Sequence, residues 1–197
     1  MAIPENLNIA LLGLGWAGKF HIQSIQSIPG ISLRCVVDVD ESLARCLAEE
    51  LQCDYSISAE GPLGQADIDA VIVASPTQEH YGQIIAALDA GKPVFTEKPL
   101  GSTLEEIDTC FDLAKRNDLP LLVGFNRRFD PSFSSLVRGV KEGQVGVLQM
   151  LRVTSRDSPL PTMDYISTSH ASFTTALCTT SICCVSLRVR TRWRYTQ

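Results

Sequence analysis

Residues 7–18 read Leu-Asn-Ile-Ala-Leu-Leu-Gly-Leu-Gly-Trp-Ala-Gly, an apolar run of strand length that ends in three spaced glycines. Residues 19–28 follow at once, with isoleucines at helical spacing. In a strand–turn–helix of this kind, Gly13 permits the tight bend and Gly15 lets the backbone approach a pyrophosphate. Gly18 lets the helix pack closely against the strand, and the free N–H groups at the helix N-terminus attract phosphates. The pattern predicts a dinucleotide-binding turn made of Gly13, Leu14, Gly15, Trp16, Ala17 and Gly18.

An acidic residue follows the second buried-strand pattern, Ile31–Val37. Asp38 lies about 20 residues beyond the last glycine of the turn, where the ribose 2′-hydroxyl of a dinucleotide is bound in this arrangement. A carboxylate there accepts hydrogen bonds from the ribose diol and repels a 2′-phosphate, so NAD is favoured over NADP. The alternative is that Asp38 and Asp40 cap a helix that begins near Glu41.

Strand and helix patterns then alternate along the chain. The expected elements are a helix over 41–51, a short strand near 55, a strand over 70–74, a helix over 78–90, a strand over 93–96, a helix capped by Ser102 or Thr103, and a strand over 121–123. Alternation of this kind implies right-handed crossovers and a doubly wound parallel sheet, the Rossmann arrangement of the α/β class.

The unusual residues of the sequence follow the predicted strands. They are residues 13–18, Asp38, Ser75-Pro76-Thr77, Glu97-Lys98-Pro99 and Asn126-Arg127-Arg128. Because parallel strands end at one edge of a sheet, and ligands of doubly wound sheets bind beyond that edge, these segments predict one binding site.

The composition describes a globular protein of 197 residues with 45% hydrophobic residues and a net charge of −5, which disfavours nucleic acid as a partner. No apolar run approaches the ~20 residues of a membrane span, and no secretory signal is evident at the N-terminus. A cytoplasmic location is therefore expected. Seven cysteines lack the paired spacing of a zinc site. The first four (Cys35, Cys46, Cys53 and Cys110) are expected to be buried, reduced thiols.

The glycine turn, Asp38, Ser75-Pro76-Thr77 with His80, Glu97-Lys98-Pro99 and residues 124–129 together resemble the Gfo/Idh/MocA oxidoreductases, and within them the inositol 2-dehydrogenases. The resemblance covers residues 7–169. It implies homo-oligomers for full-length members, and NAD-dependent oxidation of a secondary hydroxyl on a cyclic polyol or sugar, with myo-inositol as the leading candidate.

The resemblance also implies roles for individual residues. Lys98 lies between nicotinamide and substrate, where an ammonium can hydrogen-bond the reacting hydroxyl and stabilise alkoxide character. The alternative is a solvated lysine in a proline-rich turn. Pro99 is expected to hold that turn in an unusual conformation, for which a cis peptide bond is one option. Asn126 and Arg127 lie near nicotinamide or substrate, unless they form a basic loop at a domain boundary. The prediction for His80 is a structural residue or a cofactor neighbour, and for His21 on the first helix a structural one.

A second domain is expected to begin after the Rossmann domain of residues 1–124. Residues 125–169 predict its start, with a helix from about Asp130 to Val140 and an edge strand over 147–154. In the resembled family this domain is an open sheet, and it supplies an Asp-x-x-x-His motif whose histidine takes the proton. That motif does not occur after residue 130 here, so the domain is expected to be incomplete.

Residues 170–197 change abruptly in composition and are expected to be a disordered tail. Shifting the reading frame by one base over residues 171–185 permits codons that spell the missing motif, which suggests a frame change at His170. Two function classes therefore remain: a dehydrogenase of the resembled type, and a catalytically inactive chain that only binds nucleotide.

Overall fold

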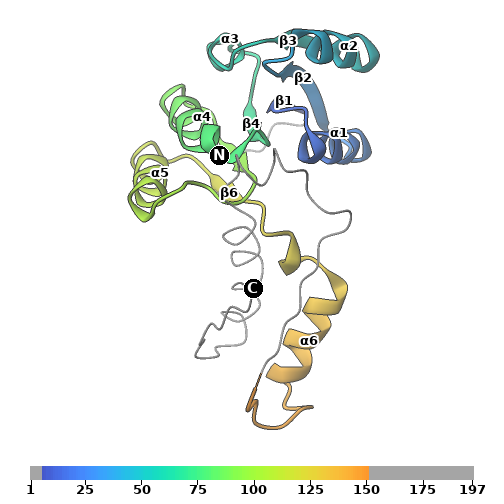
Figure 1. The fold of residues 1–197 in the computed structure, drawn as a ribbon, viewed down its shortest axis with the longest axis vertical. Helices are drawn as coiled ribbons and strands as arrows, with labels where there is room; N and C mark the ends of the chain where they lie inside the picture. Colours follow the sequence, from blue (N-terminus) through green and yellow to red (C-terminus); the bar gives the residue numbers. More distant parts are fainter. Residues whose placement is uncertain (1–5, 151–197) are drawn as a thin grey trace, which may run out of the picture. The chain divides into compact units, whose positions relative to one another are not determined.

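A six-stranded parallel sheet forms the centre of the first part of the chain. The structure is a computed structural model that describes residues 6–150, and the chain divides after Gly124 into two units. The strands of the first unit are β1 (Leu7–Leu12), β2 (Ile31–Val37), β3 (Asp54–Ser56), β4 (Ala70–Val73), β5 (Val94–Thr96) and β6 (Leu121–Val123). Their order is β3-β2-β1-β4-β5-β6, and every neighbouring pair is parallel (Figure 1). The strand order reverses between β1 and β4, which confirms the predicted doubly wound Rossmann fold.

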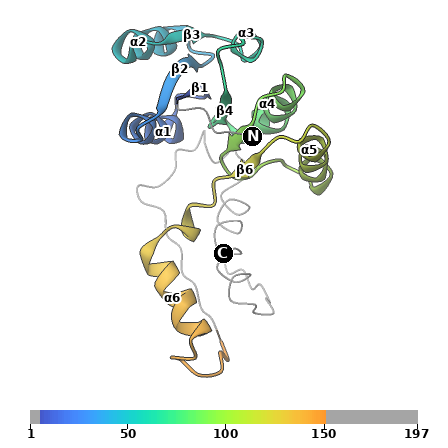
Figure 2. The same cartoon turned by 180° about the vertical axis from the view of Figure 1, so that it is seen from behind.

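Helices connect the strands and cover both faces of this sheet. They are α1 (Trp16–Ser27), α2 (Glu41–Leu51), α3 (Glu60–Leu63), α4 (Thr77–Asp89) and α5 (Leu104–Arg116). Figures 1 and 2 show α1 and α2 on one side of the strands and α4 and α5 on the other. Only α3 is absent from the sequence prediction, since four residues are too few to show a periodicity.

The core lies in two layers, one on each face of the sheet. Leu11 of β1 packs with Ile22 of α1 and Ala44 of α2. Its neighbour Leu12 faces the opposite side and packs in the layer that includes Ile84 of α4. Strands buried on both faces read as continuous apolar runs rather than alternating ones, which is why β1 and β4 are evident in the sequence.

Side-chain caps fix the starts of α2 and α5. Asp40 accepts a hydrogen bond from the backbone N–H of Leu43 at 3.1 Å, so the cap of α2 is Asp40 and not Asp38. Thr103 caps α5 in a reciprocal capping box with Glu106. Such caps contribute about 1 kcal/mol each.

The second unit begins with the 3₁₀ turn η1 (Asn126–Arg128) and α6 (Pro131–Lys141). Asp130 caps α6 by accepting from the N–H groups two and three residues on. Residues 147–150 form no strand, so the predicted edge strand is wrong over this part. The second unit offers no partner strand among residues 125–150, and a strand without a neighbour cannot satisfy its backbone. The rest of that strand, the tail and the proposed frame change lie outside the described residues.

The first four cysteines are free thiols, but they are not all buried. Cys35 and Cys110 are buried, Cys53 is partly buried and Cys46 is exposed. The prediction is therefore wrong for Cys46, which lies on the solvent side of α2, where one face of an amphipathic helix remains in water. No helix in the span 6–150 is long and apolar enough to cross a membrane.

Candidate functional site

Five loops leave the sheet at one edge, the carboxyl ends of its strands. The backbone hydrogen bonds of the sheet continue one residue beyond each of these strands, from Gly13 N–H to Val37 O (2.8 Å), Asp38 N–H to Ser56 O (3.2 Å), Ala74 N–H to Leu12 O (2.8 Å), Glu97 N–H to Val73 O (2.8 Å) and Gly124 N–H to Thr96 O (2.8 Å). These bonds fix the starting points of the loops relative to one another. The glycine turn, Asp38, Ser75 and Glu97 thereby share one edge, as predicted for a binding site.

The first and third glycines of the turn are required by close backbone approach. Gly13 has φ +93°, and a Cβ placed there would lie 2.5 Å from the Cα of Ser75. A Cβ on Gly18 would collide with the carbonyl oxygen of Gly13 and lie 3.0 Å from its carbon. Both glycines therefore close the turn against its surroundings.

Gly15 is different, because a Cβ there would meet no atom of the described residues 6–150 within 4 Å. It is exposed and forms the N-cap of α1 without any side-chain hydrogen bond to the first turn of the helix. Trp16 is 81% exposed, and Ala17 is partly buried. The space in front of the first N–H groups of α1 is thus open, and these residues fit a pyrophosphate bound there.

Asp38 lies behind the same turn. Its Oδ2 accepts a hydrogen bond from the backbone N–H of Leu14 at 2.8 Å, and its Oδ1 accepts from Asp40 N–H at 3.0 Å. Leu14 is fully buried, so this bond satisfies a backbone donor inside the turn. An ionised carboxylate has about four acceptor positions, so Asp38 can also accept from a ribose diol.

The loop after β4 is tied to the loop after β5 by His80. The imidazole is buried, with Nδ1 2.7 Å from the carbonyl oxygen of Pro99 and Nε2 2.8 Å from the carbonyl oxygen of Ser75. The Ser75 hydroxyl donates to the Gln83 side chain at 2.7 Å. Pro76 and Thr77 follow as the N-cap and first residue of α4. His80 thus holds two of the site loops together.

The loop after β5 carries Glu97, Lys98 and Pro99. Lys98 is partly exposed, Pro99 is buried, and the peptide bond between them is cis. Burial of the Glu97 carboxylate raises its pKa, but hydrogen bonding and charge from His21, together with the backbone N–H and ammonium of Lys98, outweigh that effect. The pKa of Glu97 is therefore below its ordinary value.

The sequence prediction assigned His21 no place in the site. Its Nε2 lies 3.0 Å from Oε1 of Glu97, and its ring meets Phe95 edge-on with 5.4 Å between the centroids. The contact joins residues 76 positions apart. A histidine three residues after Gly18, on the helix that follows the glycine turn, was the available signal.

Asn126 and Arg127 lie in η1 of the second unit. Asn126 is exposed, and the guanidinium carbon of Arg127 lies 5.1 Å from the ring centroid of Phe133 on α6. Stacking of this kind holds the arginine through a cation–π contact within its own unit. The proposed role of both residues near a ligand remains a prediction.

Comparison with known proteins identifies the chain's family. The Gfo/Idh/MocA family model, described as an oxidoreductase family with an NAD-binding Rossmann fold, matches residues 7–125. The chain belongs to this oxidoreductase family. Two relatives are the inositol 2-dehydrogenase of Rhizobium meliloti, 34% identical over 167 residues, and the myo-inositol 2-dehydrogenase of Thermotoga maritima, 36% identical over 168 residues. Each match covers 85% of this chain and 50% of the relative, so the chain spans about half the length of these Gfo/Idh/MocA proteins.

Solved Gfo/Idh/MocA structures share the fold. The crystal structure of a probable dehydrogenase from Thermotoga maritima matches with a TM-score of 0.84 and 34% identity, over 92% of this chain and 55% of that one. A scyllo-inositol dehydrogenase from Lactobacillus casei with bound NAD(H) and scyllo-inositol matches with a TM-score of 0.67 and 33% identity, over 72% and 42%. The Rossmann fold of residues 7–125 is thus the NAD-binding fold of the family.

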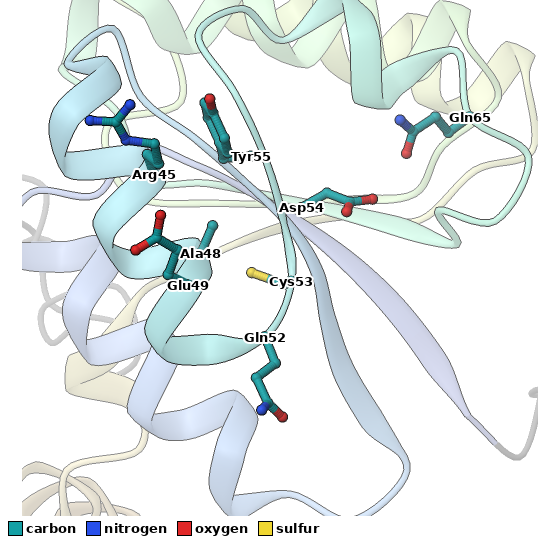
Figure 3. A pocket seen from close by; sticks show the side chains of 8 residues that line it. All are labelled: Arg45, Ala48, Glu49, Gln52, Cys53, Asp54, Tyr55 and Gln65. Carbon is teal, nitrogen blue, oxygen red and sulfur yellow. The ribbon is translucent and has the colours of Figure 1, made fainter.

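A separate pocket lies at the other end of the strands. Its lining comes from the end of α2, the start of β3 and the loop before β4, as Figure 3 shows, and consists of Arg45, Ala48, Glu49, Gln52, Cys53, Asp54, Tyr55 and Gln65. Ligands of parallel sheets bind at the carboxyl ends of the strands. This pocket is therefore distinct from the candidate nucleotide site.

Proposed function

We propose that the whole protein is an NAD-dependent dehydrogenase that oxidises a secondary hydroxyl of a cyclic polyol or sugar, and that residues 7–125 supply its cofactor site and its reactive lysine. The observation that carries the proposal is the turn closed by Gly13 and Gly18 and open at Gly15, with the Asp38 carboxylate behind it. The inositol 2-dehydrogenases among the relatives support the substrate class.

The proposed cofactor site of the first unit consists of residues at the carboxyl edge of its sheet. They are Gly13, Leu14, Gly15, Trp16, Ala17, Gly18, Asp38, Ser75, Pro76, Thr77, His80, Glu97, Lys98 and Pro99. Asn126 and Arg127 of η1 stay predicted cofactor-binding residues by the family resemblance. Bound NAD supplies the hydride acceptor. The N-terminus of α1 binds the pyrophosphate, and Asp38 accepts hydrogen bonds from the ribose diol and repels a 2′-phosphate.

Lys98 is the proposed catalytic residue. Its ammonium donates a hydrogen bond to the reacting hydroxyl oxygen and stabilises the negative charge that develops there. The proton of that hydroxyl must pass to a base, which in the resembled family is a histidine of the second domain.

A second candidate function applies to residues 1–197 alone: nucleotide binding without turnover. It is favoured by one observation, the absence of an Asp-x-x-x-His motif from residues 130–197 of the sequence. Without a base to take the proton, the reaction loses a factor of ~10²–10⁴ in rate. Without the residues that position the substrate against the cofactor, the activation barrier rises further, on the order of several kcal/mol. The expected result is NADH binding with no reduction of NAD by myo-inositol. Steady NADH production that depends on myo-inositol would refute this second candidate.

The cofactor assignment is tested by the ratio of dissociation constants for NADPH and NADH. Asp38→Ala should lower this ratio by at least about tenfold. The variant loses the hydrogen bonds to the ribose of NADH and the repulsion of the 2′-phosphate of NADPH, and a combined change of about 1.4 kcal/mol corresponds to a factor of ten. The ratio cancels any general weakening caused by loss of the bond to Leu14. Asp38→Asn keeps one acceptor but removes the charge, so it should lower the ratio similarly. A ratio that is unchanged in both variants would refute the role of Asp38.

A further inference from the structure

His21 links the helix of the glycine turn to the loop that carries Lys98. It lies on α1, and its Nε2 is 3.0 Å from Oε1 of Glu97, the residue directly before Lys98. The side chains of His21 and Glu97 are 17% and 27% exposed, so water reaches both only in part. The edge-on contact with Phe95 fixes the plane of the imidazole ring. The hydrogen bond is therefore held in a defined direction.

Glu97 in turn is held against Lys98. The backbone N–H of Lys98 hydrogen-bonds the Glu97 carboxylate, and the ammonium of Lys98 interacts with it through charge. Gly124, at the end of β6, keeps the space for this carboxylate, because a Cβ there would lie 3.3 Å from Oε1 of Glu97 and 3.1 Å from the Phe95 ring. His21, Glu97 and Lys98 thus form a continuous series of contacts.

We propose that His21 is a positioning residue for Lys98 and acts through Glu97. With His21 donating to one carboxylate oxygen, the carboxylate stays ionised and oriented while it receives the Lys98 N–H. The oriented carboxylate then holds its negative charge beside the ammonium of Lys98 and attracts it, which limits the positions that the ammonium adopts. This inference rests on the proposed role of Lys98. It adds a residue from α1 to the machinery around the lysine.

The groups that set this charge balance come from two elements. Glu97 and Lys98 belong to the loop after β5, and His21 belongs to α1. Burial raises the pKa of Glu97, and the histidine contact is the leading influence that lowers it again. Replacing His21 by a residue of similar size should therefore raise the pKa of Glu97. If His21 only filled space, the same replacement would leave this pKa unchanged.

Three variants of the full chain separate positioning from packing. His21→Phe keeps an aromatic ring against Phe95 and removes the hydrogen bond. His21→Gln restores an N–H donor without a ring. Ser24→Ala is the matched control, because Ser24 is exposed on the same helix and its hydroxyl donates to the carbonyl oxygen of Phe20, away from Glu97.

The readouts are a ¹³C NMR titration of the Glu97 carboxyl carbon, assigned by the signal lost in Glu97→Gln, and the ¹³C chemical shift of Lys98 Cε at neutral pH, assigned by the signal lost in Lys98→Arg. In His21→Phe the Glu97 midpoint should move to higher pH, and the Lys98 Cε signal should move because the carboxylate beside its ammonium is no longer oriented. His21→Gln should restore part of both changes, and Ser24→Ala should match the wild type. A folded His21→Phe protein with an unchanged Glu97 midpoint or an unchanged Lys98 Cε signal would overturn the proposal.

If His21→Phe does not fold, Glu97→Gln gives the reciprocal measurement. The ¹H signal on Cε1 of His21 and the ¹³C signal of Lys98 Cε should then both move at neutral pH, because both side chains lose the same carboxylate. Unchanged signals overturn the proposal. Binding of NADH, followed by energy transfer from tryptophan, is measured in parallel. Failure of the wild type to bind NADH would refute the proposed function, while the titrations would still decide the role of His21.

Discussion

Replacing Gly13 by alanine should destabilise the first unit by about 2–5 kcal/mol. Gly13 has φ +93°, a conformation that costs an L-residue about 1–2 kcal/mol. The new Cβ would also lie 2.5 Å from the Cα of Ser75 and 2.7 Å from the carbonyl carbon of Ala74. Overpacking of this severity costs about 1–3 kcal/mol, because backbone atoms on both sides must move. The total is a large part of the 5–15 kcal/mol typical of a domain, on the order of half.

Urea unfolding followed by circular dichroism measures this change. Gly91→Ala is the matched control, because Gly91 also has a positive φ of 74°, but within the described part of the chain a Cβ there would meet no atom within 4 Å. The control should lose only the conformational part, about 1–2 kcal/mol. The difference between the two variants then reports the close approach of β1 and the loop after β4. Equal losses in Gly13→Ala and Gly91→Ala would refute the steric argument.

Three further predictions follow from single contacts. Thr103→Ala should reduce the free energy of unfolding by about 1 kcal/mol in urea denaturation, since it removes the hydroxyl that accepts from the Glu106 backbone N–H, and no loss would contradict this cap. The pKa of Glu97 is lower in the folded chain than in the unfolded one. The ionised carboxylate therefore stabilises the fold above the ordinary glutamate pKa, and this stabilisation is lost as the pH falls through the folded value. The difference in unfolding free energy between wild type and Glu97→Gln should shrink between neutral pH and about pH 3, and a constant difference would count against it. Burial raises the pKa of Cys35 and of Cys110 to about 11. A thiol reagent at neutral pH should therefore label exposed Cys46 faster than these two cysteines, as followed by mass spectrometry of the modified peptides. Equal labelling rates of the three cysteines would contradict the burial of Cys35 and Cys110.

The fold could be predicted because its strongest signals are local. Residues 9–12 of β1 are all buried. Of the glycines that follow, Gly13 approaches the backbone after the neighbouring strand β4, and Gly18 approaches the backbone of Gly13. A strand that is buried on both faces needs apolar residues at every position, so a continuous apolar run followed by spaced glycines suffices to predict it. The prediction for β2 and α2 matched their bounds for the same reason.

The contacts that join distant loops could not be predicted in the same way. His21 and Glu97 meet only because α1 and the loop after β5 are brought together by the strand order β1-β4-β5, which no local pattern encodes. The bond from the buried N–H of Leu14 to Asp38 is a further contact that the sequence does not indicate, since it joins residues 24 positions apart. The predicted strand does not form over residues 147–150, because residues 125–150 contain no strand with which it could pair.

We expect the open N-terminus of α1 at Gly15 to bind the pyrophosphate of NAD. The decisive measurement is the dissociation constant of NADH for wild type and Gly15→Ala, each with its free energy of unfolding. Gly15 has φ −67°, and a methyl group there would meet no atom of residues 6–150 within 4 Å, so stability should change by no more than about 1 kcal/mol, as for other N-cap substitutions. The wild type should bind NADH, and Gly15→Ala should bind it at least about tenfold more weakly, a loss of about 1.4 kcal/mol or more. Equal affinity of the two folded proteins would refute this role of Gly15.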